Sequence, residues 1–236
     1  WPSIFVFLAV YGIAMIMLIH VFLAESLPRR QSLHPMSVLV NYSTLLRNPM
    51  FLIASFASGF IYAGFLAYLA SSSFVYIDML GVPVEYFGLI FITSVIGYMA
   101  GSAWSARLST HYAPERTVLL GSVLTMGAAS IIWFAASLLP DSIWAIMLPM
   151  MVYSAGIGLM VPNAMAVSLR PFPYIAGTAS ALFGFIQMSL SASATALVGS
   201  YLVDSPAPML DFILVITAFA FFLSVALFRQ RPQPKL

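Results

Sequence analysis

Two amide side chains lie inside long apolar stretches of the sequence, where they could bind a ligand by hydrogen bonds. Gln187 lies near the middle of its stretch, and Asn163 lies nearer to one end of another. An amide in hydrocarbon needs a polar partner, which can be a substrate, water or a neighbouring helix. We therefore treat both amides as candidates for a substrate cavity, with interhelical bonding as the alternative.

Hydroxyl and aromatic residues repeat at helical spacing in the same kind of stretch. Ser58, Tyr62 and Phe65 follow one another at steps of four and three residues, which places them on one helical face. Aromatic rings can hold a lipophilic or cationic compound through apolar contact and cation–π attraction, although packing is the alternative for each ring. The candidate cavity residues are Tyr62, Phe65, Gln187, Asn163, Ser58, Ser180 and Phe183.

Glycines recur at positions where helices could approach each other closely. Gly97 and Gly101 form a small-xxx-small pattern, which favours backbone contact between helices in lipid. We expect the same packing role of three more glycines, namely Gly156, Gly158 and Gly184.

Residue patterns for catalysis or metal binding are missing from the sequence. It contains no cysteine, and its three histidines, His20, His34 and His111, are far apart and have no second ligand at metal spacing. No carboxylate pair or nucleophile–base set stands out. We therefore predict no catalytic residues, no metal and no cofactor, and the chain is not expected to be an enzyme.

The composition is that of an integral membrane protein. Hydrophobic residues make up 62% of the chain and charged residues 7%, with a mean hydropathy of +1.01; a soluble domain has about 25% charged residues. Unbroken apolar runs of about 20 residues favour helices over a β-barrel. The fold class predicted is an all-α membrane protein with seven transmembrane helices, at 3–24, 49–72, 86–105, 117–138, 143–168, 174–200 and 209–228.

The charges between these runs are separated by sign. All nine Lys and Arg residues fall on one side, in 25–48, 106–116, 169–173 and 229–236. The connections on the other side, with the adjoining helix starts, carry only acids. By the positive-inside rule the basic side is cytoplasmic, so Trp1 is expected on the outer side and Leu236 in the cytoplasm. The partner implied is a lipid bilayer, and no nucleic acid is expected.

The polar segment 25–48 divides the chain. One run precedes it and six follow it, which suggests a protein of two six-helix bundles. We expect 1–24 to be the last helix of an amino-terminal bundle, 25–48 a cytoplasmic central loop, and 49–236 the carboxy-terminal bundle with a short cytoplasmic tail. Because residue 1 is Trp and an apolar run starts at once, we expect a fragment of a longer protein.

Several motifs resemble one family of transporters. Residues 156–187 contain Gly-x-Gly-x-x-x-Pro-Asn-Ala-Met-Ala and then Ala-Gly-Thr-Ala-Ser-Ala-Leu-x-Gly-x-x-Gln, which is similar to the tenth and eleventh helices of the major facilitator superfamily. The string looks closest to the Bcr/CflA multidrug efflux group of drug:proton antiporters. Residues 22–28, 47–51 and 85–89 resemble that group's end of helix six and starts of helices seven and eight.

The resemblance implies a fold, a function and a location. The seven runs would be helices 6–12 of a 6+6 fold in a bacterial inner membrane, and the six after the loop could split into three plus three. The function implied is efflux of small lipophilic or cationic compounds by proton antiport with alternating access. The substrate would be a small molecule. In the family the proton-carrying acids generally lie on helices of the amino-terminal half, and this would explain why no Asp, Glu, Lys or Arg lies deep in these runs.

One motif departs from the family, and other functions remain open. In the superfamily's loop signature Ser105 stands where an acid belongs, and Arg107 falls one place late. A complete seven-helix receptor or photoreceptor is one alternative, although the only lysine, Lys235, is outside the runs and no disulfide can form. A major facilitator of another substrate class, such as a sugar or metabolite, is another alternative.

Overall fold

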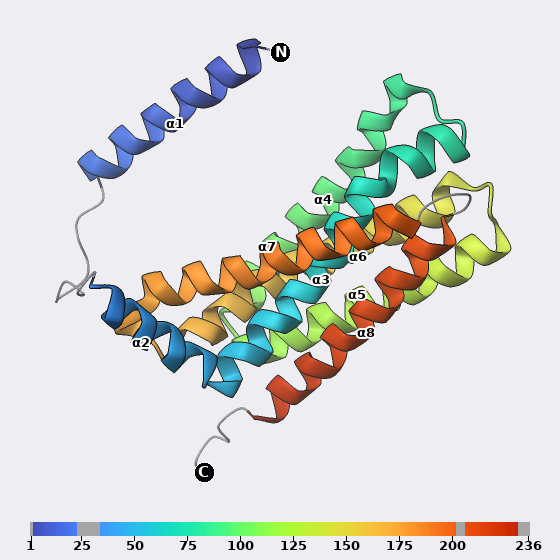
Figure 1. The fold of residues 1–236 in the computed structure, drawn as a ribbon. Coiled ribbons are helices and arrows are strands. Elements are labelled where there is room, and N and C mark those ends of the chain that lie inside the picture. The colour runs from blue at the N-terminus through green and yellow to red at the C-terminus, as the bar shows by residue number, and fades with distance from the viewer. Residues whose placement is uncertain (1, 23–33, 202–205, 231–236) are drawn as a thin grey trace. The chain divides into compact units, whose positions relative to one another are not determined.

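The computed structural model describes residues 2–22, 34–201 and 206–230, and within these ranges the regular structure is helical (Figure 1). The long elements are α1 (Pro2–Phe22), α2 (Pro35–Leu46), α3 (Pro49–Ser73), α4 (Val84–Leu108), α5 (Pro114–Leu138), α6 (Ile143–Leu169), α7 (Ala176–Tyr201) and α8 (Ala207–Arg229). A π-helix, η1 (Phe74–Met79), extends α3, and a short 3₁₀-helix, η2 (Pro173–Ile175), precedes α7.

Seven of these helices are long and apolar enough to cross a membrane, which confirms the predicted fold class. The segment 25–48 differs from the expected loop, because its described part contains α2. Prolines at the first positions of α2 and α3 need no hydrogen-bond acceptor there. Asn48 caps α3 by accepting a hydrogen bond from the backbone N–H of Phe51 at 2.9 Å.

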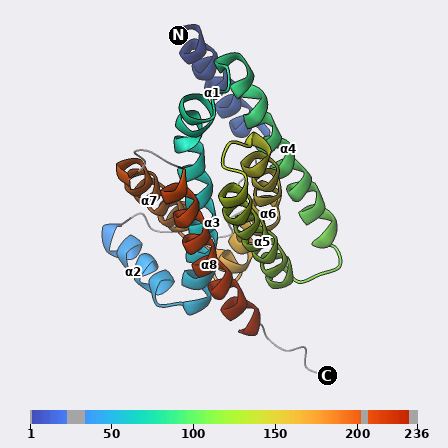
Figure 2. The same ribbon diagram turned by 90° about the vertical axis from the view of Figure 1, so that its right-hand side faces the viewer.

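The chain divides into two compact units, with α1 in one and α2–α8 in the other. Within the second unit, α3 and α6 are central (Figure 2). Helix α6 packs against α3, α4 and α5, and helix α3 packs against α6, α7 and α8. If α3 is exchanged with α6, α4 with α7 and α5 with α8, the list of the main helix pairs that pack together stays the same. It is therefore the neighbour pattern that two three-helix repeats would produce.

Small residues explain how α4 lies against α6. The buried residues of α4 are one apolar side chain and four small residues at helical spacing: Ile90, Ser94, Gly97, Gly101 and Ser105. A Cβ atom at Gly97 or Gly101 would collide with the carbonyl oxygen of Met151 or Ala155 on α6. The two backbones therefore touch, as small-xxx-small patterns allow.

The other three predicted packing glycines do not all behave alike. Gly158 lies against α4, where a Cβ would be 2.5 Å from Tyr98 O, and Gly156 lies against α5, where it would be 2.9 Å from Gly121 O. A Cβ at Gly184, by contrast, would meet no atom within 4 Å. Gly184 therefore makes no close helix contact among the described residues, and its packing role stays a prediction.

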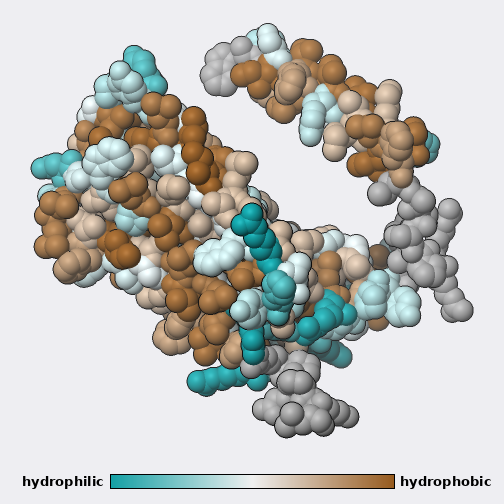
Figure 3. All heavy atoms as spheres, turned by 180° about the vertical axis from the view of Figure 1, so that it is seen from behind, coloured by the Kyte–Doolittle hydropathy of each residue, from teal (hydrophilic) through white to brown (hydrophobic). Residues whose placement is uncertain are grey.

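The outer surface of the bundle is apolar over most of its length. Figure 3 shows one face with extended brown areas and its larger group of teal side chains toward the lower end. On α8, Phe219 and Phe222 are well exposed, whereas Thr217 and Ser224 are fully buried. Polar groups thus point inward and large apolar groups outward, as lipid requires of a spanning helix.

Candidate functional site

The candidate residues on α3 form one continuous helical face with two different parts. Ser58 is fully buried, and so is Ser55 one turn before it. Tyr62 and Phe65 continue the same face but are only half-buried, with ring centroids 6.4 Å apart. The rings are therefore the part of this face that a ligand can reach in the described bundle.

The buried part of that face is covered by α7. Gln187 Nε2 donates a hydrogen bond to Ser58 Oγ at 3.3 Å, and both side chains are buried. Helix α7 lies close because α3 has a glycine there: a Cβ at Gly59 would be 2.7 Å from Leu190 Cδ1. The predicted amide is thus bonded between helices, which was the alternative to substrate contact, and its partner Ser58 lies one helical turn before Tyr62.

The second amide, Asn163, links α6 to α4. Its Nδ2 donates to Ser105 Oγ at 2.6 Å and to Leu159 O at 2.7 Å, and the residue is buried. Both amide hydrogens are therefore used within the protein. Ser105, which stands at the acid's place in the loop signature, accepts a structural hydrogen bond instead of carrying a charge.

The two remaining candidates lie on α7 and differ in exposure. Ser180 is half-buried, and its hydroxyl donates to Gly177 O at 3.0 Å within the helix. Phe183 is buried in the apolar core. The seven candidates thus separate into a half-open group, which is Tyr62, Phe65 and Ser180, and a buried group, which is Ser58, Asn163, Phe183 and Gln187.

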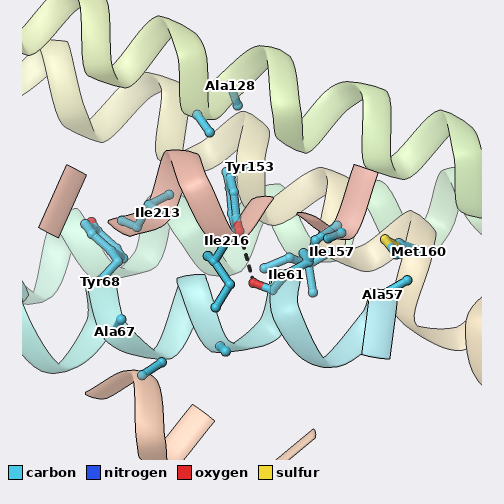
Figure 4. Close-up of a cluster of buried hydrophobic side chains, with 14 of the residues drawn as sticks. Ala57, Ile61, Ala67, Tyr68, Ala128, Tyr153, Ile157, Met160, Ile213 and Ile216 are labelled. Carbon is cyan, nitrogen blue, oxygen red and sulfur yellow. Dashed lines mark hydrogen bonds between the residues drawn. The ribbon is translucent and has the colours of Figure 1, made fainter. Parts of the chain in front are cut away.

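Tyr153 is a buried polar residue that the sequence did not single out. Its hydroxyl donates to the backbone carbonyl of Ile61 on α3 at 3.0 Å (Figure 4). It also pairs with Thr217 Oγ1 on α8 at 3.0 Å. Gly64 leaves room for it, because a Cβ there would be 2.7 Å from the Tyr153 oxygen. One hydroxyl therefore joins α3, α6 and α8 at the centre of the bundle.

The aromatic face of α3 continues into the π-helix η1. The rings of Phe65 and Tyr68 are tilted at 34° with centroids 6.4 Å apart, and the Tyr68 hydroxyl lies 3.2 Å from that of Tyr76. Ser94 Oγ on α4 is also buried. π-Helical turns are frequent at functional sites because they change the register of the side chains that follow them.

At the opposite end of the bundle, one ion pair joins two connections. Arg170 Nη2 lies 2.5 Å from Glu115 Oε1, and the glutamate is 2% exposed while the arginine is 47% exposed. Arg170 caps the end of α6 and Glu115 lies in the first turn of α5, so each charge is at the favourable end of a helix dipole. Arg170 also reaches Met50 Sδ of α3 at 3.9 Å.

A pocket of about 480 Å³ lies elsewhere, between the turn that follows η1 and the start of α6. It is mainly apolar and is lined by residues such as Val82, Tyr86 and Trp144. None of the seven candidate residues lines it.

A family model for the Major Facilitator Superfamily matches residues 1–196 of the chain. The chain belongs to the Major Facilitator Superfamily. The resemblance noted in residues 156–187 is thereby confirmed at the level of the superfamily, and the receptor and photoreceptor alternative is excluded. The chain is a multi-pass membrane protein of a family of transporters.

Relatives within the superfamily include drug-resistance proteins of bacteria. The chain is 27% identical to a bicyclomycin resistance protein homolog of Haemophilus influenzae, over 89% of this chain and 53% of that protein. It is 26% identical to the uncharacterized transporter YdgK of Bacillus subtilis, over 84% and 50%. It is 27% identical to the multidrug resistance protein MdtL of Vibrio parahaemolyticus, over 99% and 58%. The chain spans about half the length of these curated relatives.

Proposed function

We propose that this major facilitator chain is the carboxy-terminal part of an exporter for small lipophilic or cationic compounds, which works by proton antiport and alternating access. The observation that carries the proposal is the half-open aromatic pair Tyr62 and Phe65, one helical turn beyond the Gln187–Ser58 hydrogen bond. The names of the bicyclomycin and multidrug resistance relatives support the substrate class.

The chemistry of this surface suits substrates of varied shape. Tyr62 and Phe65 offer apolar area and ring faces that attract cations, without a fixed charge that would demand one partner. The Gln187–Ser58 pair contributes buried polar atoms directly beside them. The buried candidates Asn163 and Phe183 hold helices in place, so we assign them a supporting role rather than direct contact.

Proton coupling is assigned to the amino-terminal half. In the described helices, every Asp, Glu, Lys and Arg lies within two turns of a helix end, as Asp78 and Asp211 do. A proton carrier needs a titratable group within the membrane, and these helices offer none near their centres. The rocking of two halves about a central site would transmit proton binding to the surface around Tyr62.

The orientation proposed puts the basic ends of the helices in the cytoplasm of a bacterium, with Trp1 outside and Leu236 inside. The described cations lie at helix ends or caps of this side, namely Arg47, Arg107, Arg116, Arg170 and Arg229. This chain has no cysteine, so a single cysteine placed in it reports on topology once any cysteine elsewhere in the complete protein is replaced. A membrane-impermeant maleimide should label Asp141→Cys in intact spheroplasts and Tyr112→Cys only after permeabilisation; the reverse result would overturn the orientation.

Drug export is tested in the complete protein, expressed in a strain that lacks its own exporters. Tyr62→Ala and Phe65→Ala should change the ratio of resistance between compounds, whereas Phe222→Ala, at a 69% exposed site on α8, should not. A ratio separates substrate contact from instability, because unstable protein loses resistance to all compounds together. An uncoupler should abolish efflux. Equal and small effects of all three substitutions would remove the assignment of this surface.

A further inference from the structure

Helix α2 has two different faces, and only one of them packs on the bundle. The residues that are at least partly buried repeat at helical spacing and are Ser37, Val38, Asn41, Tyr42 and Leu45. This face contacts α3 and α7, and Leu45 is fully buried. This face explains why α2 packs on the bundle, but it does not explain which residues the opposite face of α2 carries.

The opposite face of α2 exposes large apolar side chains. Its four large residues are between 50% and 63% exposed, namely Met36, Leu39, Val40 and Leu46. The Thr44 hydroxyl on this face donates to Val40 O at 2.9 Å, so its hydrogen is already bonded within the helix. A helix surface in water normally carries charged or polar groups there. This face therefore suits surroundings that are apolar.

The position and charge of α2 indicate what those surroundings are. Helix α2 lies across the end of the bundle at which α3 begins (Figures 1 and 2). That end carries the described cations, including exposed Arg47 at the carboxyl end of α2 itself. The sequence has no Asp or Glu from residue 26 to 77. An apolar helix face beside cations complements the anionic surface of a cytoplasmic leaflet.

We propose that α2 is an interfacial helix, which inserts Met36, Leu39 and Val40 into the acyl boundary of the cytoplasmic leaflet while Arg47 binds the phosphate of anionic phospholipids. The lipid is thus a binding partner that holds the start of α3 at a fixed depth. The proposal rests on the orientation proposed above, since the opposite orientation would place α2 at the outer leaflet.

Spin labels on single cysteines in the complete protein, reconstituted in vesicles, test this directly. Nitroxides at Leu39→Cys and Val40→Cys should collide with oxygen more than with a water-soluble nickel complex, as at the lipid reference Phe222→Cys. The water reference Asp141→Cys should show the opposite preference. Preference for nickel at Leu39 would place the face in water, and protection from both reagents would show that protein covers it; either outcome overturns the proposal.

The choice of lipid is tested with vesicles of phosphatidylcholine alone and of phosphatidylcholine mixed with phosphatidylglycerol. The oxygen-to-nickel ratio at Leu39→Cys should be about fivefold higher in the anionic vesicles, and Arg47→Gln should remove most of this difference. The same ratio in both vesicles would show that anionic headgroups are not the ligand. Reversed maleimide labelling would overturn the orientation and with it the cytoplasmic leaflet, whereas the oxygen and nickel result tests insertion of this face in either orientation.

Discussion

Gln187 on α7 donates a hydrogen bond to Ser58 on α3 across 3.3 Å, although 129 residues of chain separate them. A second bond of the same kind joins Asn163 on α6 to Ser105 on α4. Each bond attaches a helix at the edge of the bundle to one of the two central helices. The amides therefore position the helices around the half-open rings, and the rings are the surface left for a ligand.

The Gln187–Ser58 bond should make a measurable contribution to stability. In a double-mutant cycle with Gln187→Leu and Ser58→Ala, we expect a coupling free energy of about 0.6 kcal/mol, which is typical of interhelical hydrogen bonds in membrane proteins. The cycle is measured by reversible unfolding in mixed micelles. Ser180→Ala is the matched control, because its hydroxyl bonds only within α7. Additive effects of the two substitutions would show that the bond contributes nothing.

The contact between α4 and α6 should not tolerate a side chain. Gly101→Leu should prevent the two helices from docking, because the clash is with a backbone oxygen that cannot rotate away. We expect loss of the monodisperse peak in size-exclusion chromatography. Gly184→Leu, at a position with no atom within 4 Å of its Cβ, should leave that peak intact. A well-folded Gly101→Leu variant would contradict the backbone contact.

The hydroxyl of Tyr153 should stabilise the centre of the bundle. Tyr153→Phe removes its hydrogen bonds to Ile61 O and to Thr217, so we expect a loss of about 0.5–1.5 kcal/mol per bond in the free energy of unfolding. Tyr86→Phe, at an exposed position, should change nothing. The comparison uses unfolding by denaturant. An unchanged midpoint for Tyr153→Phe would mean that the three-helix junction does not depend on this hydroxyl.

The ion pair between Arg170 and Glu115 should stabilise the fold because it neutralises a buried carboxylate. Arg170→Met leaves Glu115 buried without its cation, which we expect to cost about 2–3 kcal/mol, less than a fully buried pair because Arg170 is half exposed. The double variant Glu115→Gln with Arg170→Met should recover much of this loss. Arg116→Gln, which removes an exposed cation over the Tyr112 ring, is the control. A double variant as unstable as Arg170→Met would contradict the proposed cause.

The helices and one packing face could be predicted from the sequence because lipid leaves few alternatives. Runs of apolar residues indicate the spans, and the predicted Gly97–Gly101 pattern corresponds to buried positions of α4. Small and polar residues are costly against hydrocarbon, so their spacing marks the side that faces protein. The same reasoning left two alternatives for Gln187, substrate contact and interhelical bonding, and could not choose between them.

Partners could not be predicted, because periodicity shows a face and not what lies against it. The sequence did not indicate the role of Tyr153, because that role depends on Gly64, which lies opposite its hydroxyl in the structure. The pairing of Glu115 with Arg170 joins connections that are 55 residues apart. Helix α2 escaped notice because 12 residues are too short for a span and its apolar positions lie on both of its sides.

The glycine contacts of α4 limit how this bundle can deform. The carbonyl groups of Met151 and Ala155 lie directly on Gly97 and Gly101 of α4, so at these two positions no side chain lies between the backbones that could change rotamer and let one helix slide past the other. In the exporter that we propose, α4 and α6 would therefore move as one rigid pair, and the bending that opens the site would occur at other helix contacts.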